Sequence, residues 1–262
     1  MTRIIHIADL HFGAEDPDLV AGFEAACTAL DPDLIIAAGD FTQAARRREL
    51  SAAAAMFARI GKPVVGRPGN HDVPVYALAE RAFRPWRRFG QVLGEHVQPS
   101  WQADDLRVET LHTARRAQWR PDWSLGRAAA QTVDDVIARL AETSASTRIL
   151  ACHHPLIAPD GTDGRAATAG GPEAARRLAA VCDLVLTGHL HETFVLPSPD
   201  PDQTCWFIGT GTTFSRRTRE EAASFNLIEL EPDGIRMTQQ ESGPDGMFAA
   251  GEVWELERGA SQ

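Results

Sequence analysis

Short apolar runs, many rich in β-branched residues, alternate along much of the chain with stretches of helical period. The runs predict buried strands at Arg3–Ala8, Leu34–Ala38, Val64–Val65, Leu106–Leu111, Arg148–Cys152 and Leu184–Thr187. Helical periodicity predicts helices at Asp18–Leu30, Arg47–Ile60, Val75–Phe89, Gly126–Glu142 and Pro172–Ala180. This alternation of strand and helix predicts an α/β layer with right-handed crossovers.

The pattern changes in the last part of the chain, where three apolar runs follow one another closely. Their spacing predicts strands at Trp206–Gly209, Phe225–Leu230 and Ile235–Gln240, in a mostly antiparallel second sheet. The fold class is therefore α/β, with two sheets packed face to face and helices outside. We expect one domain over residues 1–241. Residues 242–262 combine Gly, Pro and charge, and we expect an arm that packs on the body or on a partner.

Composition narrows the class of protein. A chain of 262 residues that is 44% hydrophobic can form one large domain or two small ones. The net charge of -10 argues against binding a nucleic-acid polymer through bulk charge, although a nuclease stays open because bound metals supply their own positive field. The start has no basic leader followed by an apolar run, and no apolar stretch is long enough to span a membrane. We therefore expect a cytoplasmic protein with reduced, mostly buried cysteines.

Polar residues that can bind metals follow five of the predicted strands. They lie in the segments IADLH, AAGD, GNHD, CHHP and GHLH, and the candidate ligands are Asp9, His11, Asp40, Asn70, His153, His189 and His191. Open α/β sheets bind ligands at the carboxyl ends of their strands. A set of Asp, Asn and His without Cys suits two borderline or hard divalent ions. Each segment alone could be an ordinary turn, but the five together in this order predict a metal centre.

These segments, with LHFG and GNHDVP, resemble the signature blocks of the calcineurin-like metallophosphoesterase superfamily. Within it the chain is most similar to bacterial class III cyclic-nucleotide phosphodiesterases. The resemblance implies a four-layer αββα sandwich of two mixed sheets, the metallo-dependent phosphatase fold. It implies two divalent ions, which manganese, iron or zinc could provide. The first would be held by Asp9, His11, Asp40 and His191, and the second by Asp40, Asn70, His153 and His189.

The resemblance also implies a reaction. A hydroxide that bridges the two ions would attack phosphorus in line, and the leaving alkoxide would need a proton. His71 would face the phosphate and give that proton, and Asp72 would either orient His71 or only close the turn. Further candidates for substrate binding are Asn70, His71, His112, His154 and Arg216, with a solvated loop as the alternative for Arg216.

Three hypotheses of function follow. The leading one is a phosphodiesterase for a small phosphodiester, most simply a cyclic nucleotide. The second is a broad phosphomonoesterase or a hydrolase of nucleotide-linked lipids, which would use an exposed apolar groove near Phe83, Trp86 and Phe89. The third is a non-catalytic metal-dependent scaffold. Phe248, Val253 and Trp254 in the arm are a candidate homodimer contact, although the arm could equally fold back on its own sheet.

Overall fold

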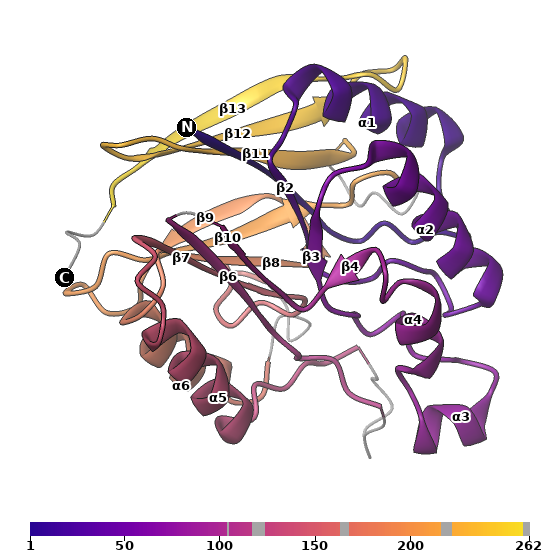
Figure 1. Ribbon diagram of the computed structural model, residues 1–262, viewed down its shortest axis with the longest axis horizontal. Coiled ribbons are helices and arrows are strands. Elements are labelled where there is room, and N and C mark those ends of the chain that lie inside the picture. The colour runs from indigo at the N-terminus through magenta and orange to yellow at the C-terminus, as the bar shows by residue number, and fades with distance from the viewer. Residues whose placement is uncertain (104, 117–123, 163–167, 216–221, 259–262) are drawn as a thin grey trace.

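A computed structural model describes residues 1–103, 105–116, 124–162, 168–215 and 222–258. Two mixed β-sheets lie face to face between two layers of helices (Figure 1). This arrangement confirms the predicted α/β class and the four-layer sandwich. No helix in these described ranges has the length and apolar character needed to cross a membrane.

The first sheet has seven strands in the order β13-β12-β11-β1-β2-β3-β4. Their bounds are β1 Thr2–Ile7, β2 Leu34–Ala37, β3 Val64–Gly66, β4 Val97–Gln98, β11 Ser224–Leu230, β12 Ile235–Ser242 and β13 Phe248–Leu256. Strands β1 to β4 run parallel, whereas β11, β12 and β13 extend the sheet beyond β1 in antiparallel pairs.

The second sheet has six strands in the order β5-β6-β7-β8-β10-β9. Their bounds are β5 Ser100–Ala103, β6 Leu106–Leu111, β7 Thr147–Cys152, β8 Leu184–His191, β9 Phe194–Pro197 and β10 Trp206–Gly211. The predicted antiparallel second sheet is wrong. Strand β10 pairs in parallel with β8, and the other two expected strands, β11 and β12, belong to the first sheet.

The helices cover the outer faces of the sandwich. They are α1 Pro17–Leu30, α2 Arg47–Ile60, α3 Leu78–Phe83, α4 Arg87–Val92, α5 Ala130–Ala141 and α6 Gly171–Ala179. Helix α1 begins where the Asp16 side chain accepts a hydrogen bond from the Asp18 backbone N–H. Helix α2 has the predicted bounds, and Gly61 directly after it adopts the left-handed conformation. The single helix expected over Val75–Phe89 is two short helices instead, with Pro85 between them.

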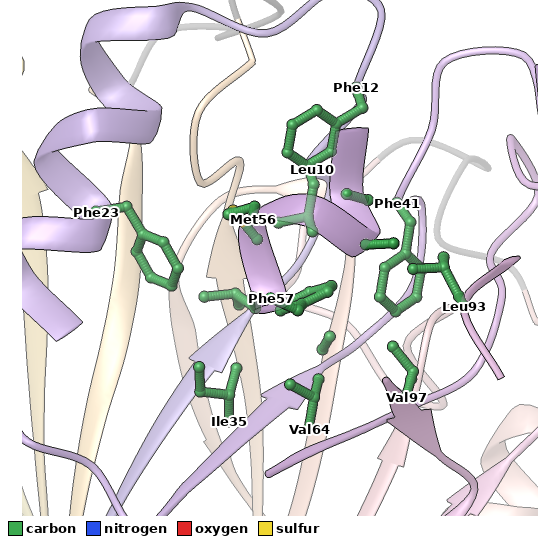
Figure 2. Packing of buried hydrophobic residues seen from close by; sticks show 14 of the residues in the cluster. Leu10, Phe12, Phe23, Ile35, Phe41, Met56, Phe57, Val64, Leu93 and Val97 are labelled. Atoms are coloured by element: carbon green, nitrogen blue, oxygen red, sulfur yellow. The ribbon is translucent and has the colours of Figure 1, made fainter. Parts of the chain in front are cut away.

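Three apolar layers hold the sandwich together. Alternate residues of β1 and β2 point to opposite faces, so Ile4 and Ile36 pack between the sheets while Ile5 and Ile35 pack under α1 and α2. Both faces are buried, which explains why these strands are continuous apolar runs. Figure 2 shows the layer under α2, where Phe57 lies among Ile35, Met56 and Val64. The third layer joins the second sheet to α5 and α6.

The segment expected to be an arm contains strand β13, which pairs with β12 along the edge of the first sheet. Most of its residues are exposed, so the hydrophobic alternation that identifies a strand is weak there. The division of the chain at residue 241 stays a prediction. All four cysteines are buried free thiols, which confirms the expectation from the sequence.

Candidate metal centre

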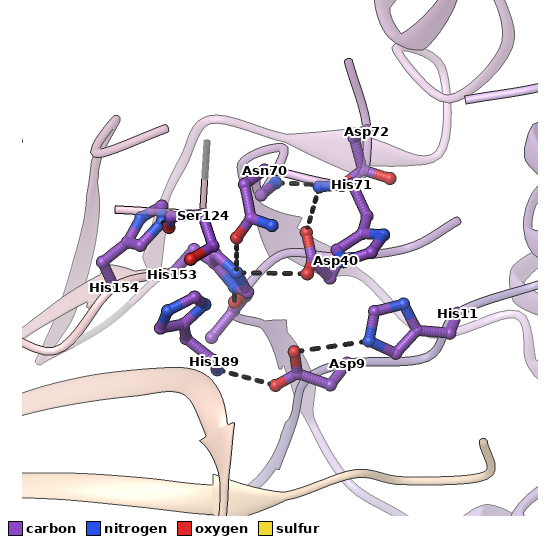
Figure 3. A network of polar contacts seen from close by, with 12 residues as sticks. Asp9, His11, Asp40, Asn70, His71, Asp72, Ser124, His153, His154 and His189 are labelled. Atoms are coloured by element: carbon purple, nitrogen blue, oxygen red, sulfur yellow. Dashed lines mark hydrogen bonds and ion pairs between the residues drawn. The ribbon is translucent and has the colours of Figure 1, made fainter. Parts of the chain in front are cut away.

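The predicted ligands meet where strands of both sheets end, and Figure 3 labels all of them except His191. Asp9 and His11 follow β1, Asp40 follows β2 and Asn70 follows β3, all from the first sheet. His153 follows β7, and His189 and His191 form the end of β8, both in the second sheet. The two sheets therefore each contribute part of one polar cluster.

Asp9, His11 and His191 form the first group. Asp9 Oδ1 lies 3.1 Å from His191 Nε2 and 3.7 Å from His11 Nε2. The two imidazole Nε2 atoms are 3.4 Å apart. Asp9 and His11 are fully buried. A carboxylate oxygen and two ring nitrogens thus converge on one point in the interior.

The second group forms around His153. Its Nε2 lies 3.3 Å from Asp40 Oδ2 and 3.0 Å from Asn70 Oδ1. Its Nδ1 lies 2.8 Å from the Ala38 carbonyl oxygen, which can only accept, so Nδ1 carries the hydrogen. This bond orients the ring and directs Nε2 at the two oxygens, an arrangement typical of metal-binding histidines.

Asp40 lies between the two groups. Its carboxylate belongs to one close set of ligand atoms with His11 and His71 and to another with Asp9 and His153, each within 4.8 Å. A carboxylate placed in this way can bridge two ions. His189 joins a third set with His153 and His154, and its backbone N–H donates to Asp9 Oδ2 at 2.8 Å.

The backbone is unusual at this edge. Positive φ angles occur at five of the seven predicted ligands, namely Asp9, His11, Asp40, His189 and His191. Such a conformation costs a residue with a side chain about 1–3 kcal/mol and is concentrated at functional sites. Gly39 has a φ of 88°, and a Cβ there would lie 2.7 Å from the His153 ring. Only glycine therefore permits this approach of the β2 loop to His153.

Opposite charges set the protonation of the second group. Burial alone would raise the pKa of the Asp40 carboxyl, but the neighbouring His153, His71 and His11 hold it well below its usual range. Burial would lower the pKa of His153, but Asp40 and Asp9 outweigh it and raise the pKa to about 9. By contrast, burial lowers the pKa of His11 to about 3 and that of His189 to about 4.

The donor set fits divalent cations. At His153 Nε2 a ring nitrogen meets two oxygen acceptors, so a proton or a cation must lie among them. Asp9 Oδ1 is buried, and among the described residues the nitrogens near it are His191 Nε2 at 3.1 Å and His11 Nε2 at 3.7 Å. Lone pairs that converge without donors in a buried site are costly unless a cation binds them. Carboxylate, amide and imidazole ligands are those that manganese, iron and zinc use.

His71 lies half-buried beside these groups. Its Nδ1 is 2.9 Å from the Gln43 carbonyl oxygen, and its backbone N–H donates to Asp40 Oδ1 at 2.8 Å. Because the carbonyl only accepts, Nδ1 carries a hydrogen, and Nε2 is the atom left for a substrate.

Asp72 is engaged elsewhere. Its carboxylate accepts from the backbone N–H groups of Phe41, Thr42 and Gly69 at 2.9–3.1 Å and from the Thr42 hydroxyl at 2.8 Å. Burial and the charge of Asp40 raise the pKa of Asp72 to about 7. The bond from Gly69 favours the alternative in which Asp72 closes its turn, and the bonds from Phe41 and Thr42 also join that turn to a second loop. The carbonyl of Gln43 is the group that contacts His71 Nδ1.

The remaining substrate candidates are spread around the centre. His154 is buried, with Nδ1 2.9 Å from Thr113 Oγ1 and Nε2 2.7 Å from the Ser124 carbonyl oxygen, so both ring nitrogens have protein partners. His112 is half-buried beside Trp86, and neither ring nitrogen has a hydrogen-bond partner among the described residues. Burial lowers its pKa to about 4, so the ring is neutral near pH 7. Arg216 lies outside the described residues.

The sequence did not indicate the main-chain partners of this centre. The carbonyls of Ala38 and Gln43 orient two imidazoles, and a backbone carbonyl has no signature in the sequence. The positive φ angles were equally hidden, because most Asp and His residues have a negative φ even though both types are enriched among the exceptions. Arg67, which donates from Nε to Thr110 Oγ1 at 3.0 Å, lies three residues before Asn70 and was also missed.

Two mixed sheets with flanking helices and a cluster of Asp, Asn and His at the strand ends define the metallo-dependent phosphatase fold. Residues 2–193 match the family model of calcineurin-like phosphoesterases, and the chain belongs to that family. The family indicates a phosphoester hydrolase that uses divalent metals. Among curated protein sequences, none matches the chain.

Several solved structures share the fold. GAP50, the anchor in the inner membrane complex of Plasmodium, has a TM-score of 0.66 and 13% identity over 100% of this chain and 90% of that chain. Purple acid phosphatase PPD1 from yellow lupin (Lupinus luteus) seeds has a TM-score of 0.66 and 12% identity over 98% of this chain and 54% of that one. Vacuolar protein sorting 29 from Cryptosporidium parvum has a TM-score of 0.53 and 17% identity over 98% of both chains. Identities this low indicate a common fold and no more.

Proposed function

We propose that this protein is a dinuclear metal-dependent phosphodiesterase that hydrolyses a small phosphodiester, with a cyclic nucleotide as the preferred substrate. The observation that carries the proposal is the convergence of ligand atoms from five strand-end loops, with Asp40 between two groups. Asp9, His11, Asp40 and His191 would hold one ion, and Asp40, Asn70, His153 and His189 the other. Such a pair supplies an activated water and neutralises the charge of the phosphate.

The protein's own residues supply the remaining chemistry. Asn70 lies next to both His71 and the centre, where its amide can orient a phosphate oxygen as well as bind an ion. In its protonated form His71 donates Nε2–H to the leaving oxygen while Nδ1–H stays bound to the Gln43 carbonyl. A general acid of this kind contributes roughly 10²–10⁴-fold to turnover. His71 is thus the residue we assign to protonation of the leaving group.

A hydrolase of nucleotide-linked lipids is the second candidate function. The supporting observation is that the segment after Asp72 exposes large apolar side chains: Tyr76 is 75% exposed, Leu78 69% and Phe83 83%. Of the three residues expected to form an apolar groove, only Phe83 is exposed to this degree, since Trp86 is half-buried and Phe89 is buried. For this function the exposed apolar surface would have to lie beside the metal centre, so that the lipid chain could bind to it.

The rival of another class is a metal-dependent scaffold without activity. Two proteins of similar fold are described as an anchor and as a sorting protein. His71 argues against this rival, because a scaffold needs no group to protonate a leaving alkoxide. The cytoplasmic location and the homodimer stay predictions.

One assay separates these functions. Protein loaded with Mn²⁺, Fe²⁺ or Zn²⁺ is given bis-p-nitrophenyl phosphate, cyclic nucleotides, nucleoside monophosphates and UDP-linked lipids. We expect hydrolysis of the diesters, with cyclic nucleotides preferred. Preference for monophosphates or for lipids would replace the first proposal with its alternatives, and no turnover with any metal would favour the scaffold.

A further inference from the structure

A cavity of about 260 Å³ lies beside the metal centre, between helix α4 and the carboxyl ends of β3 and β6. Its volume lies below the roughly 300–1,000 Å³ of sites that enclose drug-sized ligands, so it suits a single ring system. The side chains that define it are Arg67, Trp86, Phe89, Val97, Pro99 and His112. None of the roles assigned above for metal binding or proton transfer uses its apolar walls.

The register of the second sheet places this cavity next to the metal centre, where the proposed function puts the phosphate of the substrate. Leu111 pairs with Cys152 in the parallel β6–β7 ladder, so His112 and His153 leave adjacent strands at the same edge. On the other side, Arg67 and Pro68 line the cavity and lead directly to Gly69 and Asn70. A substrate whose phosphate lies at Asn70 and His153 could therefore extend a neighbouring group into the cavity.

The polar groups of the cavity have unused hydrogen-bonding capacity. His112 is neutral and half-buried, and no residue that the structure describes is a hydrogen-bond partner of its Nδ1 or Nε2. Arg67 uses Nε for Thr110 Oγ1, and its other N–H groups have no partner within the described ranges. A neutral imidazole offers one donor and one acceptor, and the guanidinium offers a planar row of donors. Buried polar atoms without partners are costly, so a ligand that supplies partners gains affinity there.

The walls are aromatic and apolar. Trp86 lies with its ring 4.4 Å from the His112 ring, at 83° to it, and Phe89 and Val97 are buried behind the cavity. A flat ring with polar atoms on its edge complements such a space, because its face can contact Trp86 while its edge meets Arg67 and His112. A second phosphate is a poorer match, since a single guanidinium among apolar walls cannot satisfy its oxygens.

We propose that this cavity is a nucleobase subsite, in which Trp86 contacts the face of the base and Arg67 and His112 bind its polar edge. The inference rests on the phosphodiesterase function proposed above and specifies its substrate as a nucleotide. It also makes Arg67 and Trp86 residues that determine substrate specificity.

Calorimetry can measure the contribution of the base directly. The metal-loaded protein is titrated with AMP, GMP, CMP and UMP and with ribose 5-phosphate, which has the same phosphate and sugar without a base. A phosphate-release assay on the same samples checks that the ligands stay intact. We expect at least one nucleotide to bind about tenfold more tightly than ribose 5-phosphate, the effect of one base on an aromatic side chain. Equal affinities for all five ligands would overturn the subsite.

Two variants test whether the tighter binding of nucleotides depends on this cavity. In Trp86→Leu and in Arg67→Met, we expect the ratio of nucleotide to ribose 5-phosphate affinity to fall by about tenfold. The matched control is Trp101→Leu, which alters a half-buried tryptophan on β5 outside the cavity and should keep the ratio. Circular dichroism checks the fold, and Arg67→Met decides the question if Trp86→Leu does not fold. An unchanged ratio in a folded variant would contradict the proposal.

Hydrolysis of bis-p-nitrophenyl phosphate by the same preparations distinguishes a failure of the base subsite from a failure of the proposed phosphodiesterase reaction. A protein that cleaves this diester but shows no preference for nucleotides contradicts the base subsite alone. A protein that prefers nucleotides but cleaves no diester with any metal contradicts the proposed reaction while supporting the subsite.

Discussion

The apolar layer under α1 and α2 and the polar edge at the strand ends both contain fully buried residues, but they are built in opposite ways. In the layer, Phe23 and Ile35 are fully buried on regular backbone among other apolar side chains. At the edge, Asp9 and His11 are also fully buried, yet they have positive φ angles and face other polar atoms. Burial stabilises the first region and costs free energy in the second. Burial in the layer therefore holds the fold together, while the buried polar groups of the edge carry a cost that a bound cation would offset.

Removing the shared ligand should give the largest effect on the polar edge. In Asp40→Ala the carboxylate that lies between both ligand groups is lost, so we expect metal content to fall and hydrolysis to drop to background. Metal analysis by mass spectrometry and the diester assay measure both. Asp134→Ala, which removes an exposed partner of Arg177, is the control and should change neither. Full metal occupancy in Asp40→Ala would contradict the bridging role.

Replacing the proposed acid should reduce turnover while the metals stay. His71→Asn removes the proton donor, and we expect kcat for a diester to fall roughly 10²–10⁴-fold with metal content near that of the wild type. His96→Asn, at a half-buried histidine after α4, is the control. Loss of metal in His71→Asn would instead mean that His71 is a ligand, which its closeness to His11 and Asp40 also allows.

The apolar layer should respond in the opposite way, through stability alone. In Phe23→Ala a fully buried ring that contacts Phe214 and Phe225 is lost, and we expect the free energy of unfolding to fall by about 3–5 kcal/mol. Phe83→Ala removes the same ring from an exposed position and should change stability within about 0.5 kcal/mol. Urea denaturation measures both. Similar losses for the two variants would show that burial under α1 is not the source of stability.

The same contrast explains how much the sequence could predict. The clustering of the candidate ligands was predictable because Asp40 and His153 follow apolar strands, and the carboxyl ends of parallel strands meet at one edge. Family resemblance then assigned them to two ions. The pairing predicted for strand β10 was wrong because its hairpin partner is β9, a short strand with little signal, while its other neighbour β8 is reached by a crossover. Close spacing in sequence predicted a hairpin but could not tell which sheet it joins.

The unpredictable part of the centre is its backbone. The carbonyls of Ala38 and Gln43 orient His153 and His71, and any residue could supply them. Strand β13 was missed for a related reason, since an exposed edge strand needs no apolar alternation. A site can be predicted from sequence where its chemistry requires a particular side chain. Main-chain geometry can be predicted only where it requires a particular residue, as it does at Gly39.

Cation binding should offset the cost of the polar edge. Because the ions would bind only the folded protein, we expect added Mn²⁺ to raise the free energy of unfolding, by about 2.7 kcal/mol at a free concentration one hundred times its Kd. Thermal denaturation with and without the metal, after chelation, measures the change. The Asp40→Ala variant should gain less. Equal stability of the wild type with and without any divalent metal would mean that the polar edge needs no cation.

The smallest effect isolates the strained backbone from the lost ligand. Asp40 has a φ of 52°, a conformation that glycine adopts freely and that alanine adopts at a cost of about 1–2 kcal/mol. Asp40→Gly and Asp40→Ala both remove the carboxylate and its bond from the His71 backbone, so in metal-free protein they differ mainly in this strain. We expect Asp40→Gly to be more stable by about 1 kcal/mol, less than the full strain because glycine also makes the unfolded chain more flexible. Urea denaturation of the two metal-free variants measures the difference. If Asp40→Ala were as stable as Asp40→Gly, strain at this position would be negligible, and the cost of the polar edge would lie in its buried charges alone.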